Sequence, residues 1–216
     1  MSVHTHHVKT PETLARCAGG LGLVFDPSPE FRWDYAPHLR PGEADPTPPG
    51  DQVGVYRTDP YGPMCGYNRT PAVIGVFAQP DGSHVLAWDD FKDGWGLGSR
   101  IGPGGCHLKV AIALEATAVV AERLGLERQL LVDGSGTCRV RLRQPEDPSA
   151  MQKNPTVVVE IDPTGNVKTE VEGATGAGCE ALTRGIEEAL GTVTHHEKKA
   201  EYYKPVQQQV KVGQSG

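Results

Sequence analysis

The sequence predicts an α+β protein made of two small units, each an antiparallel sheet with helices on one face. The stretch Cys106–Gly125, CHLKVAIALEATAVVAERLG, has apolar residues at helical spacing over most of its circumference, and a glycine stands where a helix would end. Short apolar runs separated by Pro/Gly turns lie on both sides of it, a pattern typical of antiparallel hairpins. A helix this apolar must lie against a broad surface, and we expect that surface to be a sheet.

Composition argues against several classes of protein. The net charge of −6 gives no electrostatic footprint for nucleic acid or for an anionic membrane. No apolar run approaches the roughly 20 residues that cross a bilayer, and the N-terminus MSVHTHHVKTPE lacks the apolar core of a signal peptide. The five cysteines contain no CxxC pair, so we expect free thiols and a cytoplasmic protein.

Residues 1–143 are predicted to form the first unit, for which a ferredoxin-like arrangement is one candidate. A short helix is expected to begin at Pro11, with Thr10 as N-cap, and to end at Gly19-Gly20. The central helix follows a glycine-rich run, which we interpret as a flexible connection. The predicted strands are Val3–Lys9, Leu21–Phe25, Val73–Ala78, His84–Asp89, Arg128–Asp133 and Thr137–Arg143.

A Pro-rich insertion, residues 26–71, interrupts this unit, and Gln52–Arg57 is its one alternating patch. Its aromatic residues suggest that parts of it dock on the body of the protein or on a partner. Together with two tyrosines near the C-terminus they are our candidates for interaction: Trp33, Tyr35, Tyr67, Tyr202 and Tyr203.

The second unit is predicted beyond a linker at residues 144–155. Residues 156–203 have a β-β-α-β pattern, in which two alternating runs flank the turn DPTGN and a glycine-rich loop precedes a helix from Cys179 to Leu190. Residues 204–216 have little to bury, and we expect a flexible tail.

Two motifs resemble known families. VVVEIDPTGNVKTEVEGATGAGCEALTRGIEEALGTV and the trailing EYY, within Thr156–Tyr203, are similar to a small uncharacterised bacterial domain family. SVHTHHVKT and VIGVFAQPDGSHVLAWD, with the central helix and the hairpin after it, resemble the hypothetical chloroplast open reading frame thirty-five family. The Pro-rich segment and YGPMCGYNRTP depart from that family's pattern, so we expect the role of the insertion to be particular to this protein.

Neither resemblance implies an activity, because both families are of unknown function. Their members are often encoded side by side near an ATPase of the AAA+ class, and here the two domains are fused. The resemblance therefore implies that they work as one unit and that such an ATPase is the partner. This is an argument by association, since a fold carries no function by itself.

Cys179 is the candidate reactive thiol. It stands at the first turn of a predicted helix, where a thiol pKa is lowered, which would suit a redox or sulfur-carrying cysteine. It also shares a stripe with Leu182 and Ile186, which favours a buried structural residue.

Anion and metal sites are weaker candidates. Gly176 and Gly178 offer backbone N–H groups before a helix, but the loop lacks the P-loop pattern, and a tight turn explains it better. Arg100 keeps an anion site open beside the other glycine-rich run. His4 and His6 would share one face of a strand, although no zinc-site spacing accompanies them and surface histidines are the simpler interpretation.

The leading hypothesis is a non-enzymatic accessory or adaptor protein, working with a protein partner and without a cofactor. A thiol-dependent redox or sulfur-carrier protein that uses Cys179 is the alternative. A sensor of a small ligand or nucleotide, which would use the glycine-rich loops, is the third. The sequence leaves the oligomeric state open.

Overall fold

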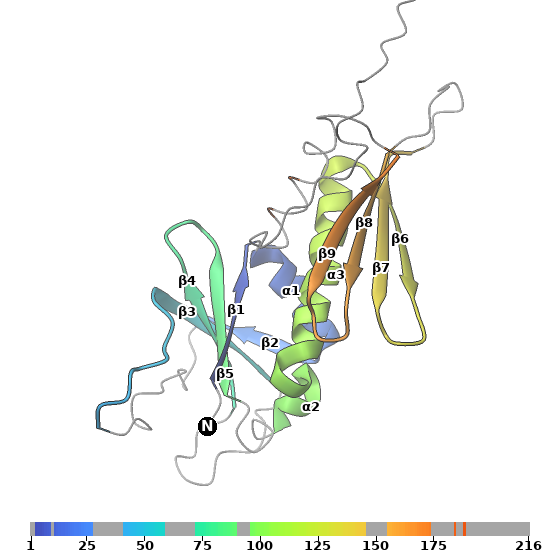
Figure 1. Ribbon diagram of the computed structural model, residues 1–216. Coiled ribbons are helices and arrows are strands. Elements are labelled where there is room, and N and C mark those ends of the chain that lie inside the picture. The colour runs from blue at the N-terminus through green and yellow to red at the C-terminus, as the bar shows by residue number, and fades with distance from the viewer. Residues whose placement is uncertain are drawn as a thin grey trace, which may run out of the picture.

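The computed structural model describes residues 3–9, 11–27, 41–58, 72–89, 96–145 and 155–173, together with Arg184 and Glu188. Within these residues the chain forms two antiparallel sheets with helices between and beside them, which confirms the predicted α+β class. Figure 1 shows the long helix α3 (Cys106–Leu124) standing between the two sheets.

The first sheet has five strands, and every neighbouring pair is antiparallel. Their order across the sheet is β1 (Val3–Val8), β5 (His84–Asp89), β4 (Ile74–Ala78), β3 (Asp51–Thr58) and β2 (Leu23–Asp26). The helix α1 (Pro11–Gly20) connects the two edge strands and packs beside α3. The predicted strands are present with small shifts at their ends. The alternating patch of the expected insertion is β3, which pairs on both sides.

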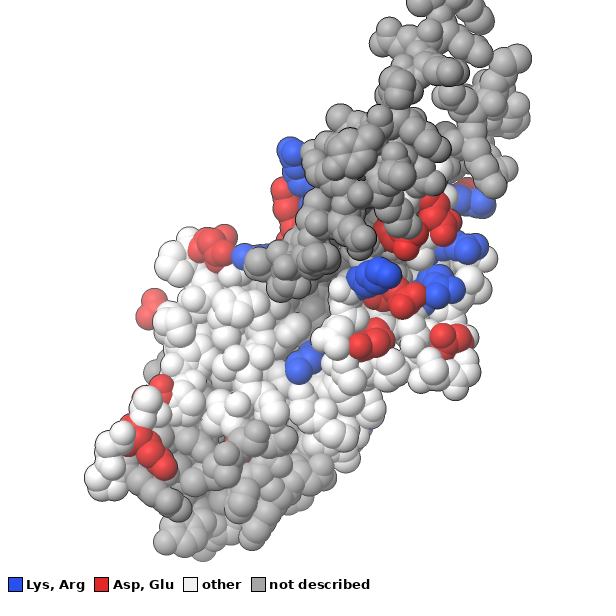
Figure 2. Space-filling view, viewed as in Figure 1, with Lys and Arg blue, Asp and Glu red and all other residues white. Residues whose placement is uncertain are grey.

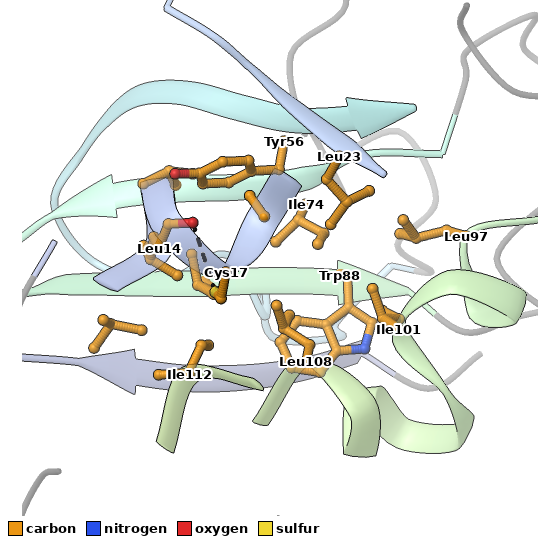
Figure 3. Packing of buried hydrophobic residues seen from close by; sticks show 14 residues of the cluster. Leu14, Cys17, Leu23, Tyr56, Ile74, Trp88, Leu97, Ile101, Leu108 and Ile112 are labelled. Carbon is orange, nitrogen blue, oxygen red and sulfur yellow. Dashed lines mark hydrogen bonds between the residues drawn. The ribbon is translucent and has the colours of Figure 1, made fainter. Parts of the chain in front are cut away.

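Apolar side chains cover both faces of this sheet. On the face under α1 and α3, Trp88 and Ile74 are fully buried, and they pack with Leu14 of α1 and Leu108 of α3, as Figure 3 shows. The opposite face carries a second buried cluster: Val55, Val73, Phe77, Val85 and Ala87. The sheet is therefore buried on both faces, which explains why its strands are almost continuously apolar.

The second sheet is formed by consecutive strands that pair in chain order: β6 (Glu127–Val132), β7 (Cys138–Arg143), β8 (Thr156–Ile161) and β9 (Val167–Glu172). In β7 buried and exposed residues alternate, and the buried set faces α3. The segment expected as a linker, residues 144–155, lies between β7 and β8, which are hydrogen-bonded neighbours. The sheet is thus continuous across the expected boundary between the two units.

The helix α3 is apolar almost all round because each sheet covers a different side of it. Leu108 and Ile112 belong to the core of the first sheet, whereas Ala113, Val120 and Ala121 belong to the core of the second. Burying one leucine or isoleucine side chain stabilises a fold by roughly 1.5–3 kcal/mol, so α3 is the main link between the two halves. Gly125 ends the helix with φ of 63°, as predicted for a left-handed C-cap.

Pro103–Leu124 is long and apolar enough to cross a membrane by length and composition, the only such helix in the described part of the chain. This corrects the expectation that no run approaches that length. In the structure two sheets cover this helix, and a buried core helix has the same composition.

The ferredoxin-like arrangement proposed for the first unit does not describe this topology. In that arrangement the second helix returns the chain to the sheet that it left, whereas here α3 leads from β5 into the second sheet. Of the expected helix Cys179–Leu190, the structure describes Arg184 and Glu188, which are helical and exposed. The expected tail, residues 204–216, lies outside the described residues.

Candidate functional site

The most exposed element of the second sheet is its edge strand β6. All six of its residues are exposed, and three consecutive apolar side chains lead into the turn: Leu130 is 41% exposed, Leu131 44% and Val132 61%. No other described strand is exposed along its whole length. An edge strand also presents backbone N–H and C=O groups along its free side. β6 therefore offers a partner both main-chain hydrogen bonds and apolar contacts.

The register of the sheet assigns these side chains to its two faces. Val132 pairs with Cys138, which is buried against α3, so Val132 and Leu130 lie on the inner face. α3 contacts this strand near Arg128, at its start, and both side chains remain exposed. Leu131 points the other way and lies opposite the exposed Arg139. The edge is thus apolar on both faces of the sheet.

The start of β6 is bonded to α3, and the turn after its end is closed by local hydrogen bonds. Near its start, Arg128 Nε donates a hydrogen bond to Thr117 Oγ1 of α3 at 3.1 Å, and Nη2 donates to the Leu114 carbonyl at 3.2 Å. After its end, the Asp133 carboxylate accepts hydrogen bonds from the Ser135 backbone N–H at 2.8 Å and the Ser135 hydroxyl at 2.6 Å. A strand whose start is bonded to a helix and whose end leads into a closed turn loses little entropy when it pairs with another chain.

Most of the rest of the outer face of this sheet is charged, and the apolar Val158 on this face is buried. Arg139 pairs with Glu160 at 2.8 Å and Arg143 with Glu127 at 2.9 Å, and the four side chains are 42–50% exposed. Figure 2 shows acidic and basic side chains side by side over this sheet. Exposed pairs of this kind contribute only about 0–1 kcal/mol each to stability. Their effect is to keep the outer face polar, which leaves Leu131 as an exposed apolar side chain on it.

A second candidate lies at the edge of the first sheet, where β1 runs beside α3. His4 pairs with Trp88 and His6 with Leu86, so both imidazoles lie on the face covered by α3, as the period of a strand predicts. The His4 ring stacks on the Trp88 indole, with ring centroids 5.8 Å apart and an interplanar angle of 19°. Both histidines are half-buried, unlike the surface histidines of the simpler interpretation.

Burial lowers the pKa of His6 to about 4, and the positive charge of Lys109 and the neighbouring His7 act in the same direction. The imidazole is therefore neutral at pH 7, because burial disfavours its charged form. Neutral imidazole can ligate a metal ion. However, no group of three or more His, Cys, Asp or Glu side chains that could hold a metal occurs among the described residues.

The glycine-rich run before α3 is closely packed where the structure describes it, which corrects the expectation of a flexible connection. It forms α2 (Gly98–Ile101), the 3-10 segment η3 (Pro103–Gly105) and the N-cap of α3. A Cβ atom added at Gly104 would lie 3.7 Å from His4 Cε1, and one at Gly105 would overlap the Trp88 indole. The glycines therefore permit close approach of the backbone to two rings.

Arg100 is exposed on α2, and its guanidinium lies over the turn after α1. A Cβ atom added at Gly22 would be 2.9 Å from Arg100 Nη1. Gly176 and Gly178, which with Arg100 were the candidates for binding an anion, lie outside the described residues.

The described cysteines are free: Cys17 and Cys138 are buried and Cys106 is half-buried. Burial raises the pKa of Cys17 to about 11, so this thiol is protonated at pH 7. Cys179 lies outside the described residues, as do the aromatic interaction candidates Trp33, Tyr35, Tyr67, Tyr202 and Tyr203.

Sequence reasoning predicted a hairpin at β6 and β7 but missed the apolar edge. The available signal was the run Leu130-Leu131-Val132. Three consecutive apolar residues put at least one on each face of a strand, whereas β7, with alternating arginines, buries one face only. Which of the two strands forms the edge depends on the order of strands in the sheet.

Comparison with known proteins identifies one domain. Residues 157–203 match the family described as Protein of unknown function (DUF2997). The chain therefore contains a domain of this family, as the resemblance of its second unit implied. No curated protein and no solved structure matches the chain. The resemblance of the first unit and the proposed fusion stay predictions. The matched domain begins within β8, so its two described strands complete a sheet that β6 and β7 begin.

Proposed function

We propose that this protein is a non-enzymatic accessory protein that docks on other protein chains, with β6 as a docking edge. The observation that supports the proposal is the fully exposed edge strand, apolar on both faces at Leu130, Leu131 and Val132. Monomeric soluble proteins usually blunt such an edge with charged residues, a proline or a bulge. The charged residues of β6, Glu127 and Arg128, lie at its start, and Leu130–Val132 carries none of these features. An ATPase of the AAA+ class is the partner that the family resemblance implies.

The experiment is affinity capture from a native lysate, with partners identified by mass spectrometry. We expect the wild-type chain to recover an AAA+ ATPase and Leu131→Lys to lose it, because a charge on the edge opposes docking. Val167→Lys is the matched control, since Val167 is 37% exposed on β9, at the opposite edge of the same sheet. Recovery of no ATPase, or equal recovery by both variants, would contradict the proposal.

The same capture discriminates the thiol alternative. An accessory protein should keep its partner after Cys179→Ser, whereas a protein that carries sulfur or electrons through this thiol should lose its function. If Cys179 is a buried structural residue, the variant should lose stability only and keep its partner.

A further inference from the structure

The strand β6 has a sequence that is complementary to itself when two copies run antiparallel. From Leu130 to Val132 it is entirely apolar, and its charged residues Glu127 and Arg128 lie at the other end. Two antiparallel copies can therefore place their apolar halves together and their charged ends apart. A two-fold axis perpendicular to the sheet generates such a pair, and two-fold dimers are the commonest symmetric oligomers.

We propose that a second copy of this chain pairs with β6 about a two-fold axis at Leu131. The pairing joins the two second sheets edge to edge into one continuous antiparallel sheet. This inference rests on the proposed docking role of β6. Because one strand edge pairs with one strand at a time, the second copy and the ATPase would compete for it.

The alternation of the strand restricts the register. Side chains directly opposite each other in an antiparallel pair lie on the same face of the sheet, so inner residues must face inner residues. With Leu131 opposite its own counterpart on the outer face, Leu130 of one copy lies opposite Val132 of the other on the inner face. All three apolar residues then meet apolar residues. The inner pairs also extend the row of Cys138 and Val140, which α3 already buries.

Neighbouring registers are less favourable. An axis at Leu130 places Glu127 opposite Asp133, two like charges. An axis at Val132 places Leu131 opposite Asp133, and an axis at Gln129 places Leu131 opposite Glu127. Only the axis at Leu131 pairs every apolar side chain of the strand with another and sets no like charges directly opposite each other.

The contact is small, which indicates that this dimer is weak. Three apolar side chains from each copy make a small interface beside the roughly 20–30 residues that each partner contributes to a standard one. Main-chain hydrogen bonds between the strands add to the apolar contact. We therefore expect a dimer that dissociates on dilution.

The test is sedimentation velocity of the full chain over a range of concentrations that spans two orders of magnitude. We expect the wild-type chain to shift from monomer toward dimer as its concentration rises. Leu131→Lys should weaken the dimer at least tenfold, because it sets two ammonium groups opposite each other at the axis. Val167→Lys carries the same charge on the other edge and should leave the dimerisation constant unchanged.

A chain that is monomeric throughout, or a dimer that Leu131→Lys leaves intact, overturns the inference. Circular dichroism of each variant shows that it is folded, which is expected because both positions are partly exposed. Capture of the ATPase separates the two proposals. If the chain is monomeric but Leu131→Lys still loses the ATPase, the docking role of β6 is supported and the dimer is overturned. If the dimer depends on Leu131 but the chain recovers no ATPase, the dimer is supported and the ATPase is overturned as the partner.

Discussion

Gly105 lies directly against the indole ring of Trp88, so that a Cβ atom at Gly105 would overlap the ring. Trp88 is fully buried in the first sheet, and Gly105 is the N-cap of α3 with φ of 75°. The glycine thus sets how closely the central helix approaches the sheet. Its backbone also adopts a left-handed conformation that other residues enter only with strain.

We predict that Gly105→Ala lowers the free energy of unfolding by about 3 kcal/mol, since it adds overpacking to backbone strain. Gly104→Ala is the matched control. Its φ is also positive, at 56°, but the added Cβ would meet only His4 Cε1 at an ordinary 3.7 Å. It should cost about 1 kcal/mol. Urea unfolding measures both variants, and equal losses of stability would show that contact with the indole is not what requires the glycine.

The buried His6 should make the fold sensitive to mild acid. Its pKa is about 4 in the folded protein and 6.5 without burial, so the unfolded chain binds the proton first. The stability that a neutral His6 provides is therefore fully present above pH 6.5 and is lost as the pH falls toward 4. The loss is on the order of 3 kcal/mol, because one unit of pKa corresponds to about 1.4 kcal/mol.

Urea unfolding midpoints measured between pH 4 and 7.5 test this prediction. In His6→Gln the unfolding midpoint should fall less at acid pH, because glutamine does not titrate. His7 lies at an exposed position on the other face of β1, so His7→Gln should keep most of the change of the midpoint with pH. If His6→Gln unfolds with the same dependence on pH as the wild type, the proton is taken up elsewhere.

Local patterns in the sequence predicted the strands, the turns and the central helix, because residue periodicity and turn chemistry act over a few neighbours. How these elements pack together could not be predicted from the sequence in the same way. The apolar circumference of α3 indicates burial, but it does not show that two different sheets share the helix. Likewise, the alternation of Cys138–Arg143 predicts a strand with one buried face, but not that Thr156–Ile161 pairs with it across the expected linker.

The candidate site depends on the same long-range information. Leu131 is an ordinary strand residue until the order of the sheet makes β6 an edge. The contact of Gly105 with Trp88 brings together positions 17 residues apart in the sequence, and no local pattern encodes it. By contrast, the placement of His4 and His6 on one face follows from the period of a strand alone.

Three hairpin turns share one hydrogen-bond pattern. In each, an aspartate carboxylate accepts hydrogen bonds from the backbone N–H and from the side-chain hydroxyl of the residue two positions later. The pairs are Asp81 with Ser83, Asp133 with Ser135, and Asp162 with Thr164. In the β8–β9 turn the hydroxyl of Thr164 is the largest cause that lowers the pKa of Asp162 to about 2. The turn therefore gains stability above pH 4 that is lost as the pH falls toward 2.

Asp162→Ala should lower the free energy of unfolding by about 1–2 kcal/mol, because several turn donors lose their acceptor. Asp45→Ala removes the same local hydrogen bonds to Thr47, but from a loop that precedes β3 and closes no hairpin. It should cost less. Thermal unfolding at pH 7 measures the loss of stability of the two variants. A larger loss for Asp45→Ala would mean that this hydrogen-bond pattern does not stabilise hairpins.

Thiol reactivity is the property in which the accessory and thiol-dependent proposals differ most directly. Iodoacetamide at neutral pH should leave Cys17 and Cys138 unlabelled in the folded protein, because both are buried and the pKa of Cys17 is about 11. Cys106 is half-buried and should react slowly. A structural Cys179, on the apolar stripe of its predicted helix, should behave like the buried pair. All five should label in urea, which provides the control for reagent access. Rapid labelling of Cys179 alone in the folded protein would favour the thiol-dependent alternative, because selective reactivity requires a thiolate that is both exposed and stabilised.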